Sequence, residues 1–389
     1  MNIKQSTKII KKKSGSSSLF SVGIINPGYG YERVSYALNQ EGVGYKRLYT
    51  LPIYKIMRAH SGFYRETPLV FDAGVDLLHT WNSLPVCRKP FIVSYECELP
   101  RYLGQVQPWQ GKFGKGLLKS ERCRKILALS EAAKNRLILN LEESGDDEII
   151  NKVSVFRGGV SLPIPPKKNY SITGPLKLLF VGTNAFRKGI VPLLNACESL
   201  IQQGVDIHLT FIGGFNERCY VYGDFIPDIK EIDSLLKEAR WVKYMGKVPI
   251  DTVFEQMILH DVLAFPTFDE SLGWVPIEAG LLGVPTIATD VFALPELIDH
   301  EKTGFLIPVD KREDRRFIGL NTVGEILKEH LDKASQDIEN GLFVAIKELA
   351  ENRLKIKQYG QNAKAKLAGI YSPELAAKDL KALYEKSLE

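Results

Sequence analysis

Two glutamates separated by seven residues are the strongest candidates for chemistry in this sequence. Glu270 and Glu278 lie in the run FPTFDESLGWVPIEAG, residues 265–280. The apolar residues before this run predict a buried strand that ends where the run begins. Pro276 suits the first turn of a helix, and Gly283 suits its end. Glu270 is therefore expected in a strand-to-helix loop, and Glu278 on the first turns of the helix.

Such a loop favours the binding of a polar, anionic ligand. In an open parallel sheet it lies at the carboxyl edge, where ligands bind. Backbone N–H groups and the positive end of the helix dipole suit a diphosphate there, and two flanking carboxylates accept hydrogen bonds from sugar hydroxyls. The alternative is that Glu278 only complements the helix dipole and that Glu270 is a solvated loop residue. The strand, the proline and the glycine around the pair favour the ligand site.

This stretch resembles the signature of the family 4 glycosyltransferases, E-x7-E in a loop with glycines followed by Glu-Ala. The similarity continues through GVPTIATD, PELI and TGFL, at residues 283–290, 295–298 and 303–306. Weaker similarity to the family occurs at residues 27–33, 124–130 and 156–160. The resemblance covers most of the chain and is weakest between residues 45 and 74.

The resemblance implies roles for single residues. Glu270 would bind hydroxyls of the donor sugar, and Glu278 would bind the donor ribose. Lys188 would neutralise the diphosphate leaving group, which makes it the second catalytic residue beside Glu270; an ordinary loop lysine is the alternative. The other residues expected to bind the donor are Gly182, Thr183, Arg187, Ser271, Leu272, Gly273 and Trp274.

The resemblance also implies a reaction. Enzymes of this family retain the anomeric configuration and need no metal for the transfer. The acceptor hydroxyl would attack on the face from which the nucleotide leaves, and the departing phosphate would take its proton. No protein nucleophile, metal or bound cofactor is expected, and the donor, a UDP- or GDP-sugar, is a substrate. The predicted enzyme is a hexosyltransferase in polysaccharide or glycoconjugate biosynthesis, acting on a glycan or lipid-linked glycan.

The chain departs from the family pattern at two places. The family usually has an arginine after the glycine at position 182, where this chain has Thr183, and Arg187 is the nearest substitute. After the strand expected at 91–93 the family often has a histidine, where this chain has Glu96. Glu96 is either a ligand for hydroxyl groups or a surface carboxylate. His79 is either a group facing the same cleft or a structural histidine.

Other readings of the sequence remain beside the transferase. A catalytically inactive relative that binds sugars, or that is a partner subunit of another glycosyltransferase, fits the two departures. A nicotinamide-dependent dehydrogenase would need G-x-G-x-x-G, but the glycine-rich loop with Gly28, Tyr29 and Gly30 ends in Arg33. This loop is instead expected to line the acceptor cleft with His79 and Glu96. A nucleic-acid partner is not expected, because a net charge of +5 is thin support for one.

Alternating strands and helices predict the elements that position these groups. Apolar runs predict strands near residues 19–25, 76–79, 90–94, 125–129, 176–181, 206–212, 261–265 and 285–289, and helices near 33–40, 130–141, 191–203 and 373–388. The expected fold is α/β of the GT-B kind, with two Rossmann-like doubly wound domains facing a central cleft.

The sequence also suggests the boundaries of these domains. The ranges expected are a basic flexible leader at 1–18, an acceptor domain at 19–165, a nucleotide-sugar donor domain at 166–370 with a helical insertion near 309–351, and a C-terminal helix at 371–389 that crosses back to the first domain. A proline- and lysine-rich stretch near residue 165 marks the join, because it sustains neither a helix nor a central strand.

The composition of the chain indicates its cellular location. No stretch reaches the roughly 18–20 apolar residues of a membrane span, and residues 1–20 lack the apolar core of a secretory signal. A cytoplasmic protein is expected. Lysines crowd the first 13 residues and residues 112–125, the second group beside Trp109 and Phe113. Peripheral contact with the anionic inner face of the cytoplasmic membrane is one interpretation, and an ordinary solvated surface is the other.

Overall fold

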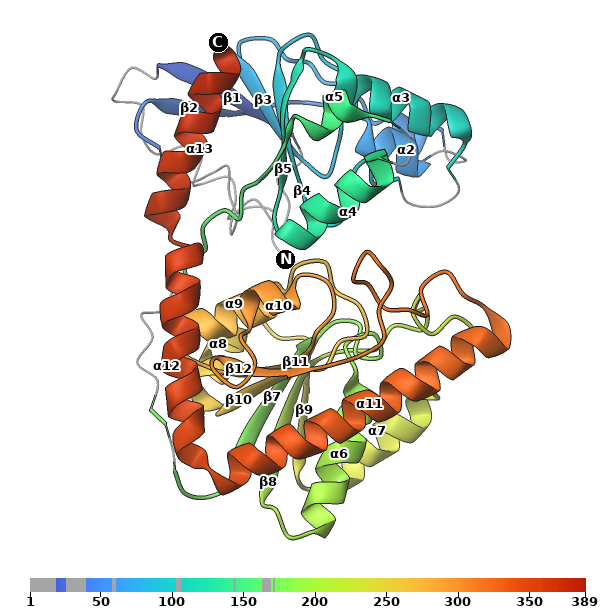
Figure 1. Cartoon of the computed structure of the whole chain (residues 1–389), viewed down its shortest axis with the longest axis vertical. Helices are drawn as coiled ribbons and strands as arrows, with labels where there is room; N and C mark the ends of the chain where they lie inside the picture. The colour runs from blue at the N-terminus through green and yellow to red at the C-terminus, as the bar shows by residue number, and fades with distance from the viewer. Residues whose placement is uncertain are drawn as a thin grey trace. The chain divides into compact units, whose positions relative to one another are not determined.

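The computed structural model describes residues 19–25, 40–57, 61–102, 106–142, 145–162, 169–170 and 172–389. They form two compact units, one of the described residues up to Ser161 together with Ile370–Glu389, the other of those in Leu162–Gly369. Each unit is built on a six-stranded parallel sheet (Figure 1). The prediction of two Rossmann-like α/β halves is confirmed. The leader at 1–18 and the glycine-rich loop with Gly28, Tyr29 and Gly30 lie outside the described residues.

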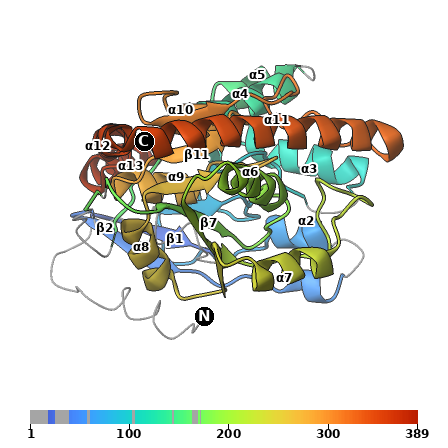
Figure 2. The same ribbon diagram turned by 90° about the horizontal axis from the view of Figure 1, so that it is seen from below.

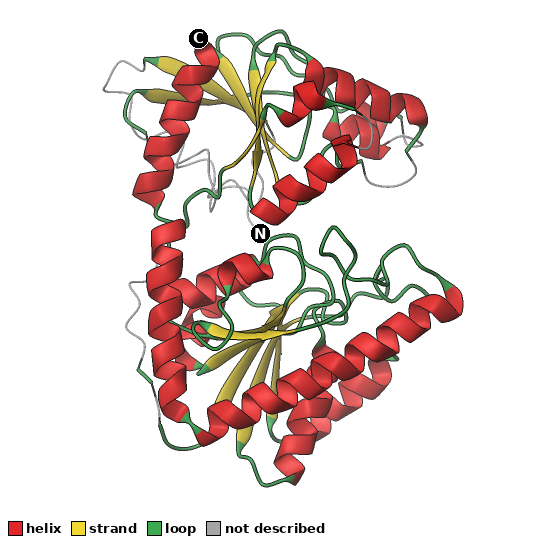
Figure 3. Cartoon of the chain, in the orientation of Figure 1, coloured by secondary structure: helices red, strands yellow, loops and turns green. Residues whose placement is uncertain are grey.

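The first unit has the strand order β2-β1-β3-β4-β5-β6. Its strands are β1 (Phe20–Ile24), β2 (Val43–Arg47), β3 (Leu77–Trp81), β4 (Phe91–Tyr95), β5 (Cys123–Ala128) and β6 (Val153–Val155). Its helices are η1 (Ile53–Lys55), α2 (Ser61–Glu66), α3 (Pro108–Lys119), α4 (Glu131–Glu142), α5 (Asp147–Ile150) and α13 (Pro373–Leu388). All five residues of β4 are buried, as expected for a central parallel strand covered on both faces (Figure 3).

The C-terminal helix α13 covers one face of this sheet. It begins after Ser372, whose hydroxyl accepts from the Leu375 amide, and Pro373 occupies its first position. Ala376, Leu380 and Tyr384 of α13 join the core of strand residues. They share one helix face because they are four residues apart. Leu375, next to Ala376 in the sequence, lies off this face and is exposed.

The second unit has the strand order β12-β11-β10-β7-β8-β9. Its strands are β7 (Leu176–Gly182), β8 (Ile207–Gly213), β9 (Val242–Gly246), β10 (Val262–Phe265), β11 (Thr286–Thr289) and β12 (Gly304–Ile307). Its helices are α6 (Ile190–Gln202), α7 (Ile229–Glu238), α8 (Ile250–Leu259), α9 (Trp274–Leu281), α10 (Leu294–Leu297), α11 (Gly324–Glu351) and α12 (Arg353–Ile370).

The order of the second sheet reverses between β7 and β10. From β7 the chain proceeds to β8 and β9 on one side, and β10, β11 and β12 follow on the other side. In doubly wound sheets the carboxyl ends of the two strands at such a reversal are where ligands bind, because the loops diverge there. The loops after β7 and β10 are therefore the place where this sheet can receive a ligand.

The segment 309–351 divides into a loop and one long helix. The loop precedes α11 and contains a short antiparallel bridge between Lys311 and Phe317. Helix α11 packs against α6, as Figure 2 shows from below. Across the described residues, no helix combines the length and the apolar character that crossing a membrane requires.

Candidate functional site

Two predicted residues from distant parts of the chain meet at the reversal in the second sheet. Lys188 lies in the loop after β7 and Glu270 in the loop after β10, and the Lys188 Nζ contacts a carboxylate oxygen of Glu270. Both side chains are nearly buried, with 10% and 11% of their surfaces exposed. The Lys188 Nζ also lies 4.2 Å from the centre of the Phe265 ring. The sequence predicted both residues, and the strand order brings them together.

Backbone contacts hold the two loops against each other. The Phe268 amide donates to the Arg187 carbonyl at 2.9 Å. The Thr267 hydroxyl donates to the Arg187 and Asp269 carbonyls, at 3.2 and 2.8 Å. Gly189 has φ +79°, and a Cβ there would lie 2.0 Å from the Pro266 carbonyl oxygen. Glycine is required because the two backbones approach so closely.

Helix α9 presents its amino end to this site. Gly273 precedes the helix with φ +98°, and Leu272 and Trp274 flank it. Glu278 lies on the second turn and is only 1% exposed. Gly283 follows the helix with φ +78°, as the sequence predicted for the residue that ends it. The positive end of the helix dipole favours an anion here.

Opposite charges surround the Glu270 carboxylate. Besides Lys188, the Arg187 Nη1 lies 4.0 Å from the Glu270 Oε2, and the Ser271 amide donates to the Glu270 Oε1 at 3.1 Å. Burial and the neighbouring Arg187 guanidinium lower the pKa of the Lys188 ammonium well below its usual value, while Asp269 opposes this shift. The basic side chains of Arg187 and Lys188 and the Glu270 carboxylate thus share a small, largely desolvated space.

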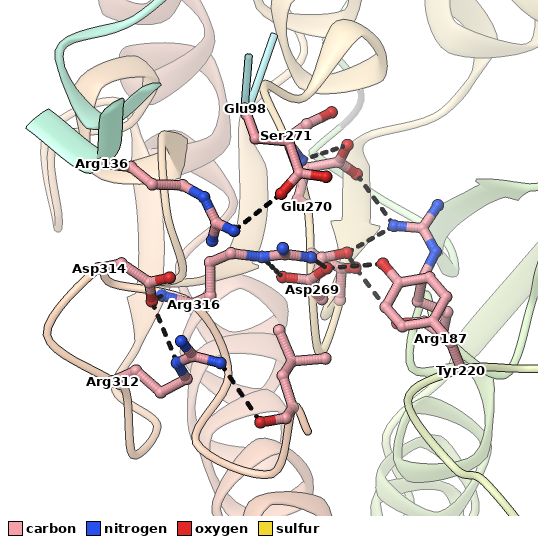
Figure 4. A network of polar contacts seen from close by, with 12 residues as sticks. Glu98, Arg136, Arg187, Tyr220, Asp269, Glu270, Ser271, Arg312, Asp314 and Arg316 are labelled. Carbon is pink, nitrogen blue, oxygen red and sulfur yellow. Dashed lines mark hydrogen bonds and ion pairs between the residues drawn. The ribbon is translucent and has the colours of Figure 1, made fainter. Parts of the chain in front are cut away.

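Sequence reasoning missed a buried carboxylate next to Glu270. Asp269 accepts from the Arg316 guanidinium at both oxygens, with 2.9 Å between the Arg316 Nε and the Asp269 Oδ1, and the Tyr220 hydroxyl donates to its Oδ2 at 2.6 Å (Figure 4). The Arg187 Nη1 donates to the Asp269 carbonyl at 2.6 Å. Asp269 therefore links the loops that follow β7, β8, β10 and β12.

No regular spacing in the sequence predicts the hydrogen-bond network around Asp269. Tyr220 and Arg316 lie 49 and 47 residues from Asp269 along the chain. The one sequence feature that could have indicated the network is Asp269 itself, because a charged residue just after a buried strand often forms an ion pair or a hydrogen bond. Which partner it takes depends on how the loops fold together.

The position of the missing arginine is occupied by an exposed threonine. Thr183 follows Gly182 at the end of β7, and its side chain is exposed. A Cβ at Gly182 would lie 2.9 Å from the Lys188 Cγ, so the glycine leaves room for that lysine. Arg187, the substitute named from the sequence, is the cation that reaches the Glu270 loop.

His79 is a structural residue, which contradicts the expectation that it lines a cleft. It lies within β3 and is fully buried. Its Nδ1 is 2.8 Å from the Tyr384 hydroxyl of α13, and its Nε2 is 2.8 Å from the Ser94 hydroxyl of β4. Burial lowers its pKa from 6.5 to about 3, so the ring is neutral at ordinary pH. The ring fastens α13 to the sheet and is not available to a ligand.

Glu96 lies at the carboxyl end of β4, where the sequence placed it. Its amide donates to the Asn82 side chain at 3.1 Å, and its carboxylate lies 3.4 Å from the Arg101 Nη1. Asn82 follows β3 and has φ +53°. Polar groups from two neighbouring strands thus meet at the same edge of the first sheet.

Comparison with known proteins gives matches over part of the chain. Residues 175–315 match the family model for glycosyl transferases of group 1. The amylovoran biosynthesis glycosyltransferase AmsK of Erwinia amylovora is 27% identical over 194 residues, covering 45% of this chain and 44% of AmsK. The N-acetyl-alpha-D-glucosaminyl L-malate synthase of Bacillus anthracis is 32% identical over 145 residues, covering 37% of this chain and 35% of the synthase. The chain therefore matches less than half of the length of these curated relatives.

Solved structures share the whole fold. HepE of Anabaena, solved in complex with UDP and glucose and also with UDP-glucose, has a TM-score of 0.59 and 14–15% identity, with 94% of this chain and 99% of HepE covered. At this identity the likeness establishes the fold, which is GT-B. Residues 175–315 thus match the glycosyl transferases of group 1, and the described chain has the GT-B fold. These matches support the resemblance to the family 4 glycosyltransferases that the motifs predicted.

Proposed function

We propose that this chain is a retaining glycosyltransferase that moves a hexosyl group from a UDP- or GDP-sugar to a hydroxyl of a glycan or lipid-linked glycan. The contact between Lys188 and Glu270 carries the proposal. It joins a cation for a leaving phosphate to a carboxylate for sugar hydroxyls, beside the amino end of α9. Relatives named for polysaccharide biosynthesis, and a solved fold relative that binds UDP-glucose, support this choice of substrates.

In this proposal the second unit binds the donor. Glu270 accepts hydrogen bonds from the sugar, Glu278 binds the ribose, and amides near Gly273 and Trp274 bind the sugar and the diphosphate. The Lys188 ammonium now held by Glu270 turns to the diphosphate when the donor enters. Charge on an anionic ligand offsets the desolvation that lowers the pKa of Lys188, so donor binding favours the protonated lysine.

Leaving-group stabilisation supplies the chemistry. As the glycosidic bond breaks, negative charge grows on the phosphate oxygen, and Lys188, Arg187 and the helix amides are positioned to stabilise it. Two side-chain cations perform the role that a divalent metal has in other transferases, so we expect the transfer to proceed without one. The acceptor hydroxyl attacks from the side of the departing phosphate, which takes its proton.

We assign acceptor binding to the first unit, including the carboxyl edge of its sheet with Glu96. Glu96, Asn82 and Arg101 offer both hydrogen-bond donors and acceptors, as hydroxyl-rich acceptors require. A cytoplasmic location is expected, because the nucleotide sugars used as donors are made there.

Release of free nucleotide tests the proposal. Wild-type protein is incubated with UDP-, GDP-, ADP- and CMP-sugars, with and without a chelator, together with candidate glycan acceptors. We expect release from one donor, unaffected by the chelator, and reduced about 100-fold or more by Glu270→Ala and by Lys188→Ala. Exposed residues of α7 give matched controls, Glu231→Ala and Lys237→Ala, which should behave as wild type.

The same assay separates the alternatives. Retention is checked on the product by the coupling constant of the new anomeric proton, and an inverted centre would contradict the proposed mechanism. Binding of a donor without release, in the presence of acceptors, would favour the inactive relative that serves as a sugar-binding or partner subunit. Release that depends on a metal would overturn the roles given to Lys188 and Arg187.

A further inference from the structure

Helix α3 of the first unit leaves large aromatic side chains in solvent. Trp109 and Phe113 are 49% and 43% exposed. Each is packed at one edge on Phe63 of α2, with ring centroids 5.0 and 5.8 Å apart. Helices α2 and α3 accordingly lie side by side in both views (Figure 1, Figure 2). Val106, just before α3, is exposed as well.

Lysines share the outer surface of α3 with these rings. At 100° per residue, Trp109, Phe113 and Gly116 form one stripe, and Lys112 and Lys119 lie directly beside it. The buried residues Gln110, Gly114, Leu117 and Leu118 occupy the adjoining side, which faces the interior of the unit. We call the exposed stripe with its two lysines the α3 face. An apolar stripe bordered by lysines is the pattern of a helix that lies in the plane of a membrane interface.

Positive charge predominates on α3 and on the elements η1 and α2. The charged residues of η1, α2 and α3 are Lys55, Arg65, Glu66, Lys112, Lys115 and Lys119, five cations against one carboxylate. Burial raises the pKa of that carboxyl, Glu66, to about 7, so much of its charge is absent near neutral pH. Helix α5, which contacts α3, contributes carboxylates: Asp146 before it lies 2.7 Å from both Lys115 and Lys119, and Asp147 and Glu148 are exposed. The excess of positive charge is therefore that of η1, α2 and α3.

Exposed aromatic rings next to lysines favour an anionic lipid surface as the partner of α3. A tryptophan and a phenylalanine suit the headgroup region, where an amphipathic ring has both an apolar and a wet side. Lysines at the border keep their ammonium groups at phosphate level while their alkyl stems lie along the apolar stripe. No aspartate or glutamate occurs in α3, so nothing on this helix repels an anionic surface.

We propose that the α3 face docks the first unit on a bilayer containing anionic phospholipids, with Trp109 and Phe113 in the headgroup region and Lys112 and Lys119 at the lipid phosphates. This inference adds a membrane partner to the proposed transferase. Docking would bring a lipid-linked acceptor in the bilayer close to the first unit, to which we assign acceptor binding. It depends on the proposed function only for that purpose, because the docking itself needs no catalytic residue.

Vesicle flotation of the full chain tests the docking. The probes are vesicles of phosphatidylcholine alone and of phosphatidylcholine with about 30 mol% phosphatidylglycerol. We expect binding to the anionic vesicles at least about tenfold stronger than to the neutral ones, weakened as salt rises from about 0.1 M to about 0.5 M. The double variant Trp109→Ala/Phe113→Ala should lose about tenfold or more.

A second variant changes charge only, because removal of Trp109 and Phe113 could disturb the packing on Phe63. Lys112→Glu changes an exposed side chain and should weaken anionic binding about fivefold or more. Lys237→Glu on α7 and Leu354→Ala on α12 are matched controls at exposed sites of the second unit, and both should bind as wild type. Thermal melting checks that each variant is folded.

Three results would overturn the inference. They are equal binding to neutral and anionic vesicles, binding unaffected by both α3 variants, and a change from dimer to monomer in those variants, which would make the α3 face a protein interface. Nucleotide release from the donor in the presence of a water-soluble acceptor reports the proposed function separately. It should be unchanged in Lys112→Glu, so failure of docking and failure of transferase activity are distinguishable.

Discussion

At the scale of residues, Glu270 is held from several sides before any substrate arrives. Lys188 contacts its carboxylate, Arg187 lies 4.0 Å away, and the preceding residue Asp269 is fixed by Arg316 and Tyr220. Asp269 is buried and charged, and such a group is tolerated only when its hydrogen bonds are satisfied. We infer that it is a positioning residue that fixes the direction of Glu270.

Replacement of this buried carboxylate tests the positioning role. Asp269→Asn leaves the Arg316 guanidinium with a weaker partner, and we expect about 2 kcal/mol loss of stability and a kcat reduced about tenfold or more. KM for the donor should change less than kcat, since the binding groups remain. The measurement is a donor titration of nucleotide release, alongside urea unfolding.

The matched control lies in the same loop as Arg316. Asp314 lies 3.5 Å from the Arg312 Nε and accepts from the Arg316 amide at 3.2 Å. The Asn side chain keeps an oxygen that can accept from this amide, so Asp314→Asn should keep kcat near the wild-type value. If Asp269→Asn lost stability but kept full turnover, its role would be structural only.

At the scale of elements, the site depends on two loops whose backbones touch. The loop after β7 turns at Gly189, beside the Pro266 carbonyl at the end of β10. The helix α6 begins directly after this glycine, so the turn sets both the helix and Lys188. Helix α3 is an element that the sequence described only as a basic segment with aromatics. The three glycines of α3 lower its helix propensity, so the sequence did not predict a helix here. Reciprocal capping between Gln107 and Gln110 stabilises its first turn.

The close approach at Gly189 gives a prediction about loop geometry. Gly189→Ala places a Cβ 2.0 Å from a carbonyl oxygen at φ +79°, and we expect a loss of about 2–4 kcal/mol and weaker donor binding. Gly204 has φ +86° with nothing within 4 Å of a Cβ, so Gly204→Ala isolates the strain of the left-handed conformation. The difference between the two urea midpoints measures the contact between the loops. Equal midpoints would mean that the backbones separate at little cost.

At the scale of the whole molecule, the last helix of the chain, α13, packs in the first unit. Helix α13 completes the core of the first unit, and Tyr384 bonds His79 across 305 residues of sequence. Two units result, of which the first is made from both ends of the chain. A hydrogen bond to a neutral, buried histidine makes this closure sensitive to acid.

The sign of that sensitivity follows from the lowered pKa of His79. Its folded pKa of about 3 lies below the unfolded value of 6.5, so the stability it supports is complete above pH 6.5 and is lost as the pH falls below that value. We expect about 2 kcal/mol of loss between about pH 6.5 and about pH 5. His79→Gln should flatten this dependence in urea unfolding, whereas His208→Gln at an exposed position of β8 should not. A slope that survives in His79→Gln would assign it to other groups.

Sequence patterns determined much of this protein because they act over neighbouring residues. The buried runs predicted eight of the strands, and the local order of strand, loop, proline and glycine placed Glu270 and Glu278 correctly on either side of the start of α9. The strands β2, β6, β9 and β12 were missed, and they are the edge strands of the two sheets. Strands β2, β6 and β9 contain no fully buried residue, so they lack the apolar run that marks a central strand.

Only the tertiary structure decided which residues meet. The strand order puts β7 beside β10 and so brings Lys188 to Glu270, 82 residues apart. It also gives Asp269 its partner Arg316 and buries His79 under α13, where the sequence had suggested a group in a cleft. Local propensity cannot settle such pairings, because the contacts depend on the packing of loops and layers that are remote in sequence.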